Sequence, residues 1–525
     1  MIRRPPRSTL SSSSAASDVY KRQLLYSMAV IGEVLKIAVE VADKVFTYPN
    51  PKEAQQEVLK ELLRKAEPTA FGRFYQFRSI LSSGDHCEAF ANEVPFHSYD
   101  SMYERWWYKT LEGGEDVTWP GKVKYFSVSS GTTSKKKHIP VTHDMLKSIR
   151  KAGLQQVKGV ADFDLPAEFF EKEMLLFGSS TNLKKVNDHY EGEISGICAS
   201  QLPFWVEGYY RPGKDISSID DWDERVTALA KEAPNWDIGS ISGIPSWIEL
   251  MLKRVIEHHG LKNIHEIWPN LMVYTSGGVA FEPYRKGFER ITGKPIVVID
   301  TYLASEGYLA TQIRKDTDAM ALITDNGIYF EFVPFTDENI DEDGSIRPNA
   351  KALMIEEVEE GTQYVLVIST VSGAWRYTIG DTIVFTDKER AEIKITGRTK
   401  HFLNVVGSQL SVIQMNRAME ELEKEFDYDI KEFTVAALLE QDNYLHRWYL
   451  GVEGEVYQQD SNIAQRLDEI LRENNKNYNV ARSKALKSVQ VNIIPNRLFQ
   501  QWTEETKQKG GQVKVPRVMK EKDFR

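Results

Sequence analysis

The sequence predicts an α/β protein, with a large N-terminal α/β domain over residues 28–396 and a smaller α+β domain over 397–525. Between about residues 120 and 400, short apolar runs alternate with helical patterns, which is typical of α/β domains. After Gly397 the pattern shifts to helices and strands of a separate, smaller unit. The 525 residues are 41% hydrophobic and 27% charged, an ordinary globular composition, and their number allows roughly two to four domains.

Residues 1–27 are expected to be a disordered or artefactual extension. The first 23 residues hold six serines and five basic residues against one Asp, for a local charge of +4. Such a serine-rich run cannot bury enough apolar surface to fold. It resembles translated adapter sequence, so we expect the native chain to begin near Met28. An Arg- and Ser-rich transit peptide is the open alternative.

The elements follow in order from their periodicity. Helical spacing over 30–46, and again after Pro51, predicts two amphipathic helices. One face of the second helix carries Val58, Leu59, Leu62 and Leu63. Core strands are predicted at 123–128, 174–177, 271–274, 296–299, 320–323, 328–332 and 364–369. Helices are predicted among them at 144–159, 221–233, 247–258 and 282–292. Asp325-Asn326-Gly327 predicts a tight hairpin between the two strands that flank it.

The C-terminal domain has its own pattern. Its helices are predicted at 412–426 and 462–473, and its strands at 433–439, 448–453 and 489–494.

Charge and hydropathy exclude several classes of protein. The net charge of −10 argues against a nucleic-acid binder, which would carry a basic face. A mean hydropathy of −0.42 and the lack of a long apolar run argue against a membrane-spanning protein. Two cysteines, Cys87 and Cys198, cannot build a disulfide framework and fit a reducing compartment. We therefore expect a cytoplasmic protein, monomeric, without nucleic-acid or membrane partners.

The segment from Tyr125 to Lys137 is the most informative in the chain. A predicted strand runs into Ser129-Ser130-Gly131-Thr132-Thr133-Ser134, and three lysines come directly after it. Backbone N–H groups of such a loop can form an anion-binding nest, to which hydroxyl and ammonium groups add contacts with phosphate. The alternative is a polar surface turn with solvated lysines. A Walker A loop is absent from the sequence.

Two further segments carry carboxylates beside tyrosines. Asp300-Thr301-Tyr302-Leu303-Ala304-Ser305-Glu306 comes after an apolar strand, where open α/β sheets bind ligands. There a Tyr can stack on a purine, and Glu306 can hold Mg²⁺. In Arg376-Tyr377-Thr378-Ile379-Gly380-Asp381, the Asp can accept both hydroxyls of a ribose. The alternatives are a capped loop and a β-turn Asp.

The last two segments lie at and after the predicted domain boundary. Gly397-Arg398-Thr399-Lys400 can form a hinge between the domains. Near the end of the chain, Gly510-Gly511 makes a mobile turn that presents Lys514, and Pro516 stiffens the backbone beyond that lysine. The alternative for this end is a frayed basic tail.

In this order, the five segments resemble the superfamily of adenylate-forming enzymes. Within it, the chain resembles the auxin-responsive Gretchen Hagen family of acyl acid–amido synthetases. That family carries an SSGT-type phosphate loop, a Tyr…Ser-Glu motif, a Tyr-x-x-Gly-Asp motif and a C-terminal Lys-x-Pro-Arg. Here these read 129–133, 302–306, 377–381 and 514–517. The likeness extends from about residue 50 to the C-terminus, with Ser134 and Thr378 as departures from the superfamily's usual Gly and Arg.

The resemblance implies ATP and Mg²⁺ as cofactors and assigns a role to each matching residue. Phosphate contacts fall to Ser129, Ser130, Gly131, Thr132, Thr133 and Lys137. Gly277, Gly278 and Tyr302 border the adenine, and Asp381 and Arg398 hold the ribose. Ser305 lies near the α-phosphate, Glu306 is the metal ligand, and Lys514 is the catalytic lysine.

The implied activity is ATP-dependent adenylation of a small carboxylic acid, followed by acyl transfer to an amino acid to form an amide. Two alternatives stay open: an acyl-CoA ligase that forms a thioester, and a catalytically silent acid-binding module. The acid pocket is expected to draw on 202–210 and 244–247, which are rich in Trp and Tyr.

Overall fold

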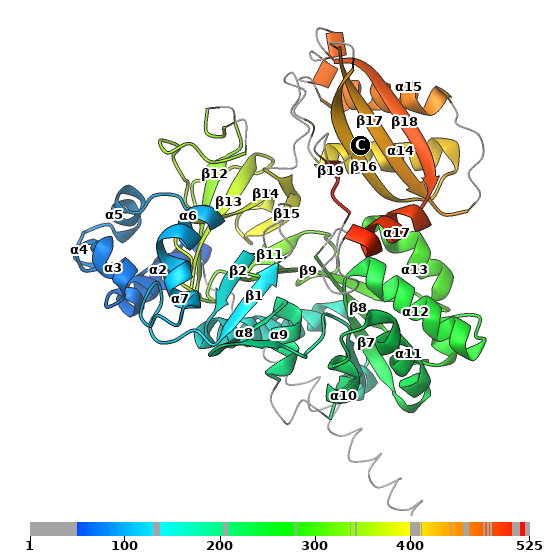
Figure 1. The fold of residues 1–525 in the computed structure, drawn as a ribbon, viewed down its shortest axis with the longest axis horizontal. Coiled ribbons are helices and arrows are strands. Elements are labelled where there is room, and N and C mark those ends of the chain that lie inside the picture. Colours follow the sequence, from blue (N-terminus) through cyan, green and yellow to red (C-terminus); the bar gives the residue numbers. More distant parts are fainter. Residues whose placement is uncertain are drawn as a thin grey trace, which may run out of the picture.

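Figure 1 shows the computed structural model of the chain. The residues that it describes are 50–129, 137–202, 208–278, 281–336, 338–341, 344–399, 410, 412–440, 443–454, 461–475, 478–479, 482–483, 486–506 and 515–519. The predicted extension at 1–27 and the predicted helix at 30–46 lie outside them.

A helical layer opens the described chain. Helix α2 (Pro51–Ala66) begins at Asn50, whose side chain accepts hydrogen bonds from the backbone N–H groups of Lys52 and Glu53. The predicted apolar face is buried. The short helices α3 (Ala70–Phe74), α4 (Phe77–Leu81), α5 (His86–Glu93), α6 (Tyr99–Met102) and α7 (Tyr108–Leu111) come next. Together they cover one end of the large sheet and share its core.

The large sheet has eleven strands in the order β12-β13-β14-β15-β11-β10-β9-β8-β7-β3-β6. Its parallel half contains β3 (Glu173–Leu176), β6 (Tyr210–Arg211), β7 (Ile238–Gly243), β8 (Val273–Gly277) and β9 (Val297–Ala304). Its antiparallel half contains β10 (Gly307–Thr311), β11 (Met320–Leu322), β12 (Ile328–Pro334), β13 (Gln363–Thr370), β14 (Tyr377–Asp387) and β15 (Glu392–Arg398). Strand β9 is parallel to β8 and antiparallel to β10, so the direction of pairing changes there.

Helices α11 (Trp222–Glu232), α12 (Pro245–His259) and α13 (Arg285–Ile291) pack beside the parallel half and form a second core with it. These elements and α8 (His143–Gly159) confirm the predicted strand–helix alternation. A separate sheet has the order β2-β1-β5-β4 and contains β1 (Tyr125–Ser129), β2 (Lys137–Val141), β4 (Lys184–Val186) and β5 (His189–Gly192). Helices α9 (Ile194–Ser200) and α10 (Lys214–Ser217) complete the described helices of this domain.

The predicted hairpin at Asp325-Asn326-Gly327 is wrong. Strand β11 pairs with β10 and β15, whereas β12 pairs with β13, so the two strands beside this turn are not partners. The turn instead binds α8, because Ser148 Oγ donates to the carbonyl of Asn326 at 2.7 Å and Lys151 Nζ donates to Asp325. The Asn-Gly signal describes local backbone only, and tertiary contacts decided the pairing.

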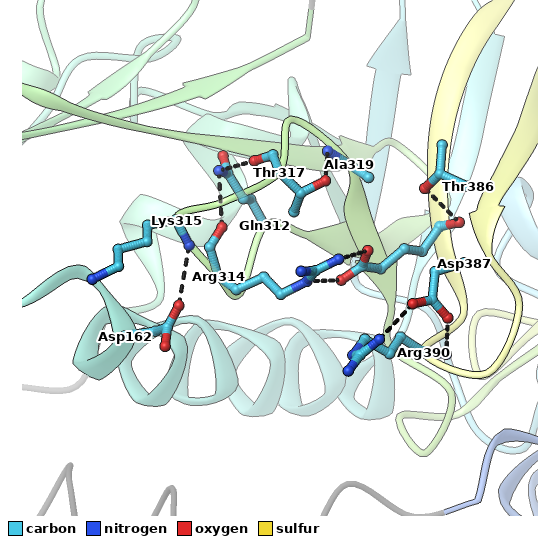
Figure 2. A network of polar contacts seen from close by, with 10 residues as sticks. Asp162, Gln312, Arg314, Lys315, Thr317, Ala319, Thr386, Asp387 and Arg390 are labelled. Atoms are coloured by element: carbon cyan, nitrogen blue, oxygen red, sulfur yellow. Dashed lines mark hydrogen bonds and ion pairs between the residues drawn. The ribbon is translucent and has the colours of Figure 1, made fainter.

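A polar network joins the two halves of the large sheet (Figure 2). The Arg314 guanidinium makes two hydrogen bonds of 2.6 and 2.7 Å with the carboxylate of Glu392 at the start of β15. Gln312 donates to the carbonyls of Arg314 and Thr317, and its backbone N–H donates to the carbonyl of Asp300 on β9. The network therefore fixes β15 relative to β9, and both strands line the same large cleft.

The C-terminal unit is a four-stranded sheet of order β18-β17-β16-β19 with its own core. Its elements are α14 (Val412–Phe426), β16 (Ile430–Glu440), β17 (Asn443–Val452), α15 (Ser461–Asn474), β18 (Leu486–Pro495), α17 (Arg497–Thr506) and β19 (Val518–Met519). All five predicted elements are confirmed, while α17 and β19 were not predicted. The boundaries at 27/28 and 396/397 stay predictions.

Two contacts attach this unit to the N-terminal domain (Figure 1). Tyr284 Oη donates to Glu432 on β16 at 2.6 Å, and Arg290 of α13 pairs with Asp429. Among the described residues, the helices are too short or too polar to cross a membrane.

Candidate active site

A cleft of about 2310 Å³ lies where the two units meet. Four parts of the N-terminal domain line it: the β1–β2 hairpin, the end of β9, the start of β14 and the end of β15. Val515, Pro516 and Arg517 line it from the C-terminal unit. The cleft therefore brings together all five segments that the sequence analysis singled out.

The β1–β2 hairpin carries the predicted phosphate loop at its tip. Ser129, the last residue of β1, pairs with Lys137, the first of β2. Ser130, Gly131, Thr132 and Thr133 lie between them, outside the described residues. The Nζ atom of Lys137 lies 5.3 Å from the centre of the Tyr99 ring. The base of the loop is thus at the cleft, and its cation is held beside an aromatic ring.

The Ser305-Glu306 pair lies directly against this hairpin. Ser127 of β1 donates to the hydroxyl of Ser305 at 3.1 Å, and both side chains are buried. Burial raises the pKa of the Glu306 carboxyl, an effect that the charges of Lys137 and Arg398 oppose. A buried carboxylate between two cations can bind a further cation once an anionic ligand such as a triphosphate has entered.

Asp381 sits between Tyr302 and Arg398. The hydroxyl of Tyr302 donates to one oxygen of the Asp381 carboxylate, and Arg398 Nε binds the other at 2.7 Å. The sheet creates this arrangement, since Asp381 on β14 is the registered partner of Arg398 on β15. Gly380, at φ +89°, provides a backbone conformation that L side chains rarely adopt just before this Asp.

Gly277 and Gly278 form the edge of the sheet next to Tyr302. Gly277 is paired with Thr301 on β9, and a Cβ atom at Gly277 would lie only 3.0 Å from Thr301 Oγ1. Gly278 has φ +84°, which favours glycine. The two glycines leave bare backbone beside the tyrosine, a surface on which a flat ring can lie.

Asp300 is a cleft residue to which the sequence analysis gave no role. Burial raises the pKa of its carboxyl to about 6, against the opposing effect of a hydrogen bond with Ser276. It lies on the same face of β9 as Tyr302, because side chains alternate along a strand. The spacing of these two residues was the signal that could have identified it.

The C-terminal motif is anchored to β16. Thr434 donates to the carbonyl of Pro516 at 2.7 Å, and the backbone N–H of Val435 donates to the carbonyl of Arg517. The Arg517 guanidinium pairs with Glu432. Lys514 lies outside the described residues, but the residues directly after it line the cleft.

Arg376 does not replace the missing Arg at position 378. Its guanidinium forms an ion pair of 3.0 Å with Glu331, and both side chains are buried. It also donates to the carbonyl of Val94 and lies over the ring of Phe96. Arg376 therefore stabilises the packing of the N-terminal helices, and proximity in sequence gave no indication of this.

No cluster of three or more His, Cys, Asp or Glu suited to a metal ion occurs in the described part of the chain. His265, expected at the surface, is buried: its Nε2 bonds the carbonyl of Leu271, and its Nδ1 accepts from the N–H of Gly293. Glu306 thus stands as a single carboxylate. This suits Mg²⁺, which commonly takes one or two protein carboxylates together with substrate phosphates.

Comparison with solved structures gives the same fold. GH3.15 acyl acid amido synthetase superposes with a TM-score of 0.71 at 15% identity, covering 90% of this chain and 93% of that one. A 2-hydroxyisobutyryl-CoA ligase bound to its acyl-adenylate gives 0.56 at 14% identity, with 90% of each chain covered.

Sequence relatives point to the same family. Indole-3-acetic acid-amido synthetase GH3.2 of Arabidopsis thaliana is 29% identical over 174 residues, 31% of this chain and 31% of that protein. GH3.3 of the same plant is 25% identical over 278 residues, 49% of this chain and 45% of the relative. These matches span a third to under half of the curated relatives.

The family's domains match in order along the chain. The GH3 family N-terminal domain matches residues 46–186, the central domain 321–398 and the C-terminal domain 413–523. Together they cover more than half of the sequence, and the chain belongs to the GH3 family.

Proposed function

We propose that this protein activates a small carboxylic acid with ATP and then joins the acyl group to the amine of an amino acid. The observation that carries the proposal is the arrangement of Asp381 between Tyr302 and Arg398, in the same cleft as Glu306 and the β1–β2 hairpin. Membership of the GH3 family and the names of the relatives support it.

ATP would lie along this cleft. The Asp381 carboxylate accepts the two ribose hydroxyls, and Arg398 keeps that carboxylate charged and oriented. The adenine lies between Tyr302 and the bare backbone of Gly277 and Gly278. The phosphates extend toward the loop 129–133 and Lys137.

The residues present fit Mg²⁺ at the triphosphate. Glu306 is the carboxylate that would hold the ion, which neutralises charge on the phosphates. Burial disfavours the charged form of Glu306 in the free protein, and an added cation offsets that cost.

In the first step, an oxygen of the substrate carboxylate attacks the α-phosphorus, and pyrophosphate leaves with the electrons of the broken P–O bond. Lys514 stabilises the negative charge that develops there. Loss of a comparable transition-state contact costs about 3–4 kcal/mol. Ser305 lies beside the α-phosphate, and its hydrogen bond from Ser127 keeps its hydroxyl oriented.

In the second step, the neutral amine attacks the acyl carbon, AMP leaves, and the nitrogen loses a proton to a base. Lys514 must withdraw to make room for the amine, so the C-terminal unit rotates about 397–400.

The test is acid-dependent exchange of pyrophosphate into ATP over a panel of carboxylic acids, followed by product analysis with amino acids or with coenzyme A. We expect exchange, an amide product with amino acids, and loss of exchange in Lys514→Ala. Thioester without amide would favour the CoA ligase. Absence of exchange across the panel, with acid binding retained, would favour a silent acid-binding module.

A further inference from the structure

Three buried donors without acceptors lie close together between α11 and α12. They are the indole N–H groups of Trp222 and Trp247 and the Nε–H of Arg225, none of which has a hydrogen-bond partner among the described residues. Arg225 is only 3% exposed. Buried polar groups in folded proteins are nearly always hydrogen-bonded, so such a cluster requires an explanation.

Packing holds the three donors in one group. Trp222 and Arg225 lie one turn apart on α11, and the rings of Trp222 and Trp247 have centroids 5.2 Å apart. The Arg225 guanidinium lies over the ring of Phe177, 5.2 Å from its centre. Trp222 and Trp247 both line the active-site cleft, so a ligand in the cleft can reach the group.

Nearby carboxylates do not use these donors. Glu193, Asp220 and Asp221 are the acidic groups that act on Arg225 electrostatically. Each of them accepts a hydrogen bond from another group, and none forms an ion pair with Arg225 within the described ranges. They compensate the charge of the guanidinium but leave its N–H groups for another acceptor.

The start of α12 points to the same place. Its first turn comes directly after β7, and its N-cap residue, Ile244, has no side chain that can accept a hydrogen bond. Ile244, Ser246 and Trp247 line the cleft. The positive end of the helix dipole and the three buried donors therefore favour the same occupant, an oxygen acceptor.

The distance from the nucleotide follows from the sheet. Gly243 at the end of β7, Ser276 on β8 and Asp300 on β9 are registered partners in one row. Two strand spacings separate the ends of this row, which is about 10 Å. An extended chain of roughly eight atoms spans that length.

We propose that Arg225, Trp222 and Trp247 form a subsite for an oxygen acceptor at the far end of the acid substrate. The substrate class is a small acid with a neutral hydroxyl, keto or ester oxygen about 10 Å from the reacting carboxylate. A neutral oxygen fits better than a second carboxylate because Glu193 also lines the cleft. This proposal rests on the proposed function and names its substrate more closely.

The experiment compares octanoic acid, ω-hydroxyoctanoic acid and octanedioic acid in pyrophosphate exchange. We expect kcat/KM about tenfold higher for the hydroxy acid than for octanoic acid, since an apolar tail leaves buried donors unpaired. Trp222→Phe keeps a ring but removes one N–H, and Arg225→Met removes the guanidinium. Both should reduce that ratio toward one, while Lys231→Met, at an exposed position of α11, should leave it unchanged.

Two results would overturn the subsite: a ratio near one in the wild-type protein, or a ratio that both variants retain. A preference for octanedioic acid would overturn the choice of a neutral oxygen. Quenching of intrinsic tryptophan fluorescence by ω-hydroxyoctanoic acid without ATP measures binding separately. Binding that depends on Arg225 in a protein without exchange would support the subsite and contradict the proposed function, whereas exchange without the ratio would do the reverse. Should Arg225→Met fail to fold, Trp222→Phe and Trp247→Phe make the same test.

Discussion

The hydroxyl of Ser127 donates to the hydroxyl of Ser305 at 3.1 Å and joins two segments 178 positions apart in sequence. Ser127 lies in the strand that leads to the phosphate loop, and Ser305 directly precedes Glu306. One hydrogen bond between buried side chains therefore connects the predicted phosphate loop with the predicted metal ligand.

The first prediction concerns this bond. Ser127→Ala leaves the buried hydroxyl of Ser305 without its donor, so the free energy of unfolding should fall by about 1–2 kcal/mol. The KM for ATP should rise, because the two segments lose their connection. Urea denaturation and pyrophosphate exchange measure the two effects.

The control for that prediction is Ser82→Ala, at an exposed position, which should change neither quantity. In a double-mutant cycle with Ser305→Ala, the two losses of stability should not add, since the second substitution removes the unpaired group. Additive losses would show that the bond contributes nothing of its own.

Local periodicity was sufficient for most elements of the fold, and the reason is visible in α2. Its Val58, Leu59, Leu62 and Leu63 repeat at helical spacing and face the core, so sequence and burial carry the same information. The hairpin at 325–327 failed because strand pairing depends on residues far away. The three-residue strand β11 pairs with β10 and β15 instead of the neighbouring β12.

The site was predictable as far as its motifs reached. Tyr302, Asp381 and Arg398 do meet, although 79 positions separate the first two. Asp300 and Arg225 were not assigned any role, since their importance comes from burial, which no short pattern records. Arg376 shows the opposite case: a charged residue next to a motif is in fact part of the core.

The second prediction concerns pH and Asp300. Its pKa is raised by burial from 3.8 to about 6 in the folded protein, so the folded state binds its proton more tightly than the unfolded state. The protonated carboxyl therefore stabilises the fold below pH 4, and this contribution is lost as the pH rises from about 4 to 6.

Asp300→Asn removes this titration and should be more stable than the wild type at pH 7 by up to about 2 kcal/mol. The difference between the two proteins should shrink toward pH 4. Thermal unfolding at several pH values measures it, and a difference that does not vary with pH would contradict the assignment. The same variant also tests whether the carboxyl contacts ATP, through the KM for ATP.

The third prediction concerns Glu306. Glu306→Gln keeps the shape of the side chain but removes the charge that would hold Mg²⁺, so half-maximal exchange should need at least tenfold more Mg²⁺. Titration of Mg²⁺ at saturating ATP measures the change. Glu282→Gln, an exposed carboxylate of the same cleft, is the matched control and should leave the requirement unchanged. An equal shift in both variants would indicate a general effect of charge in the cleft.

The fourth prediction concerns the contact between the two units. Tyr284→Phe removes the hydroxyl that donates to Glu432 at 2.6 Å, and Glu432 also pairs with Arg517 at the end of the Lys514 segment. In this arrangement Val515, Pro516 and Arg517 line the cleft, which is the position that adenylation requires of the segment.

Loss of the Tyr284 hydroxyl should therefore weaken the adenylation arrangement by about 1 kcal/mol and lower the exchange rate about fivefold. Amide formation from acyl-adenylate supplied in advance should change less, because that step comes after the rotation away from this contact. Single-turnover measurements separate the two steps, and Tyr209→Phe, at an exposed position, is the control. If both steps slowed equally, the contact would stabilise the protein as a whole without selecting either arrangement.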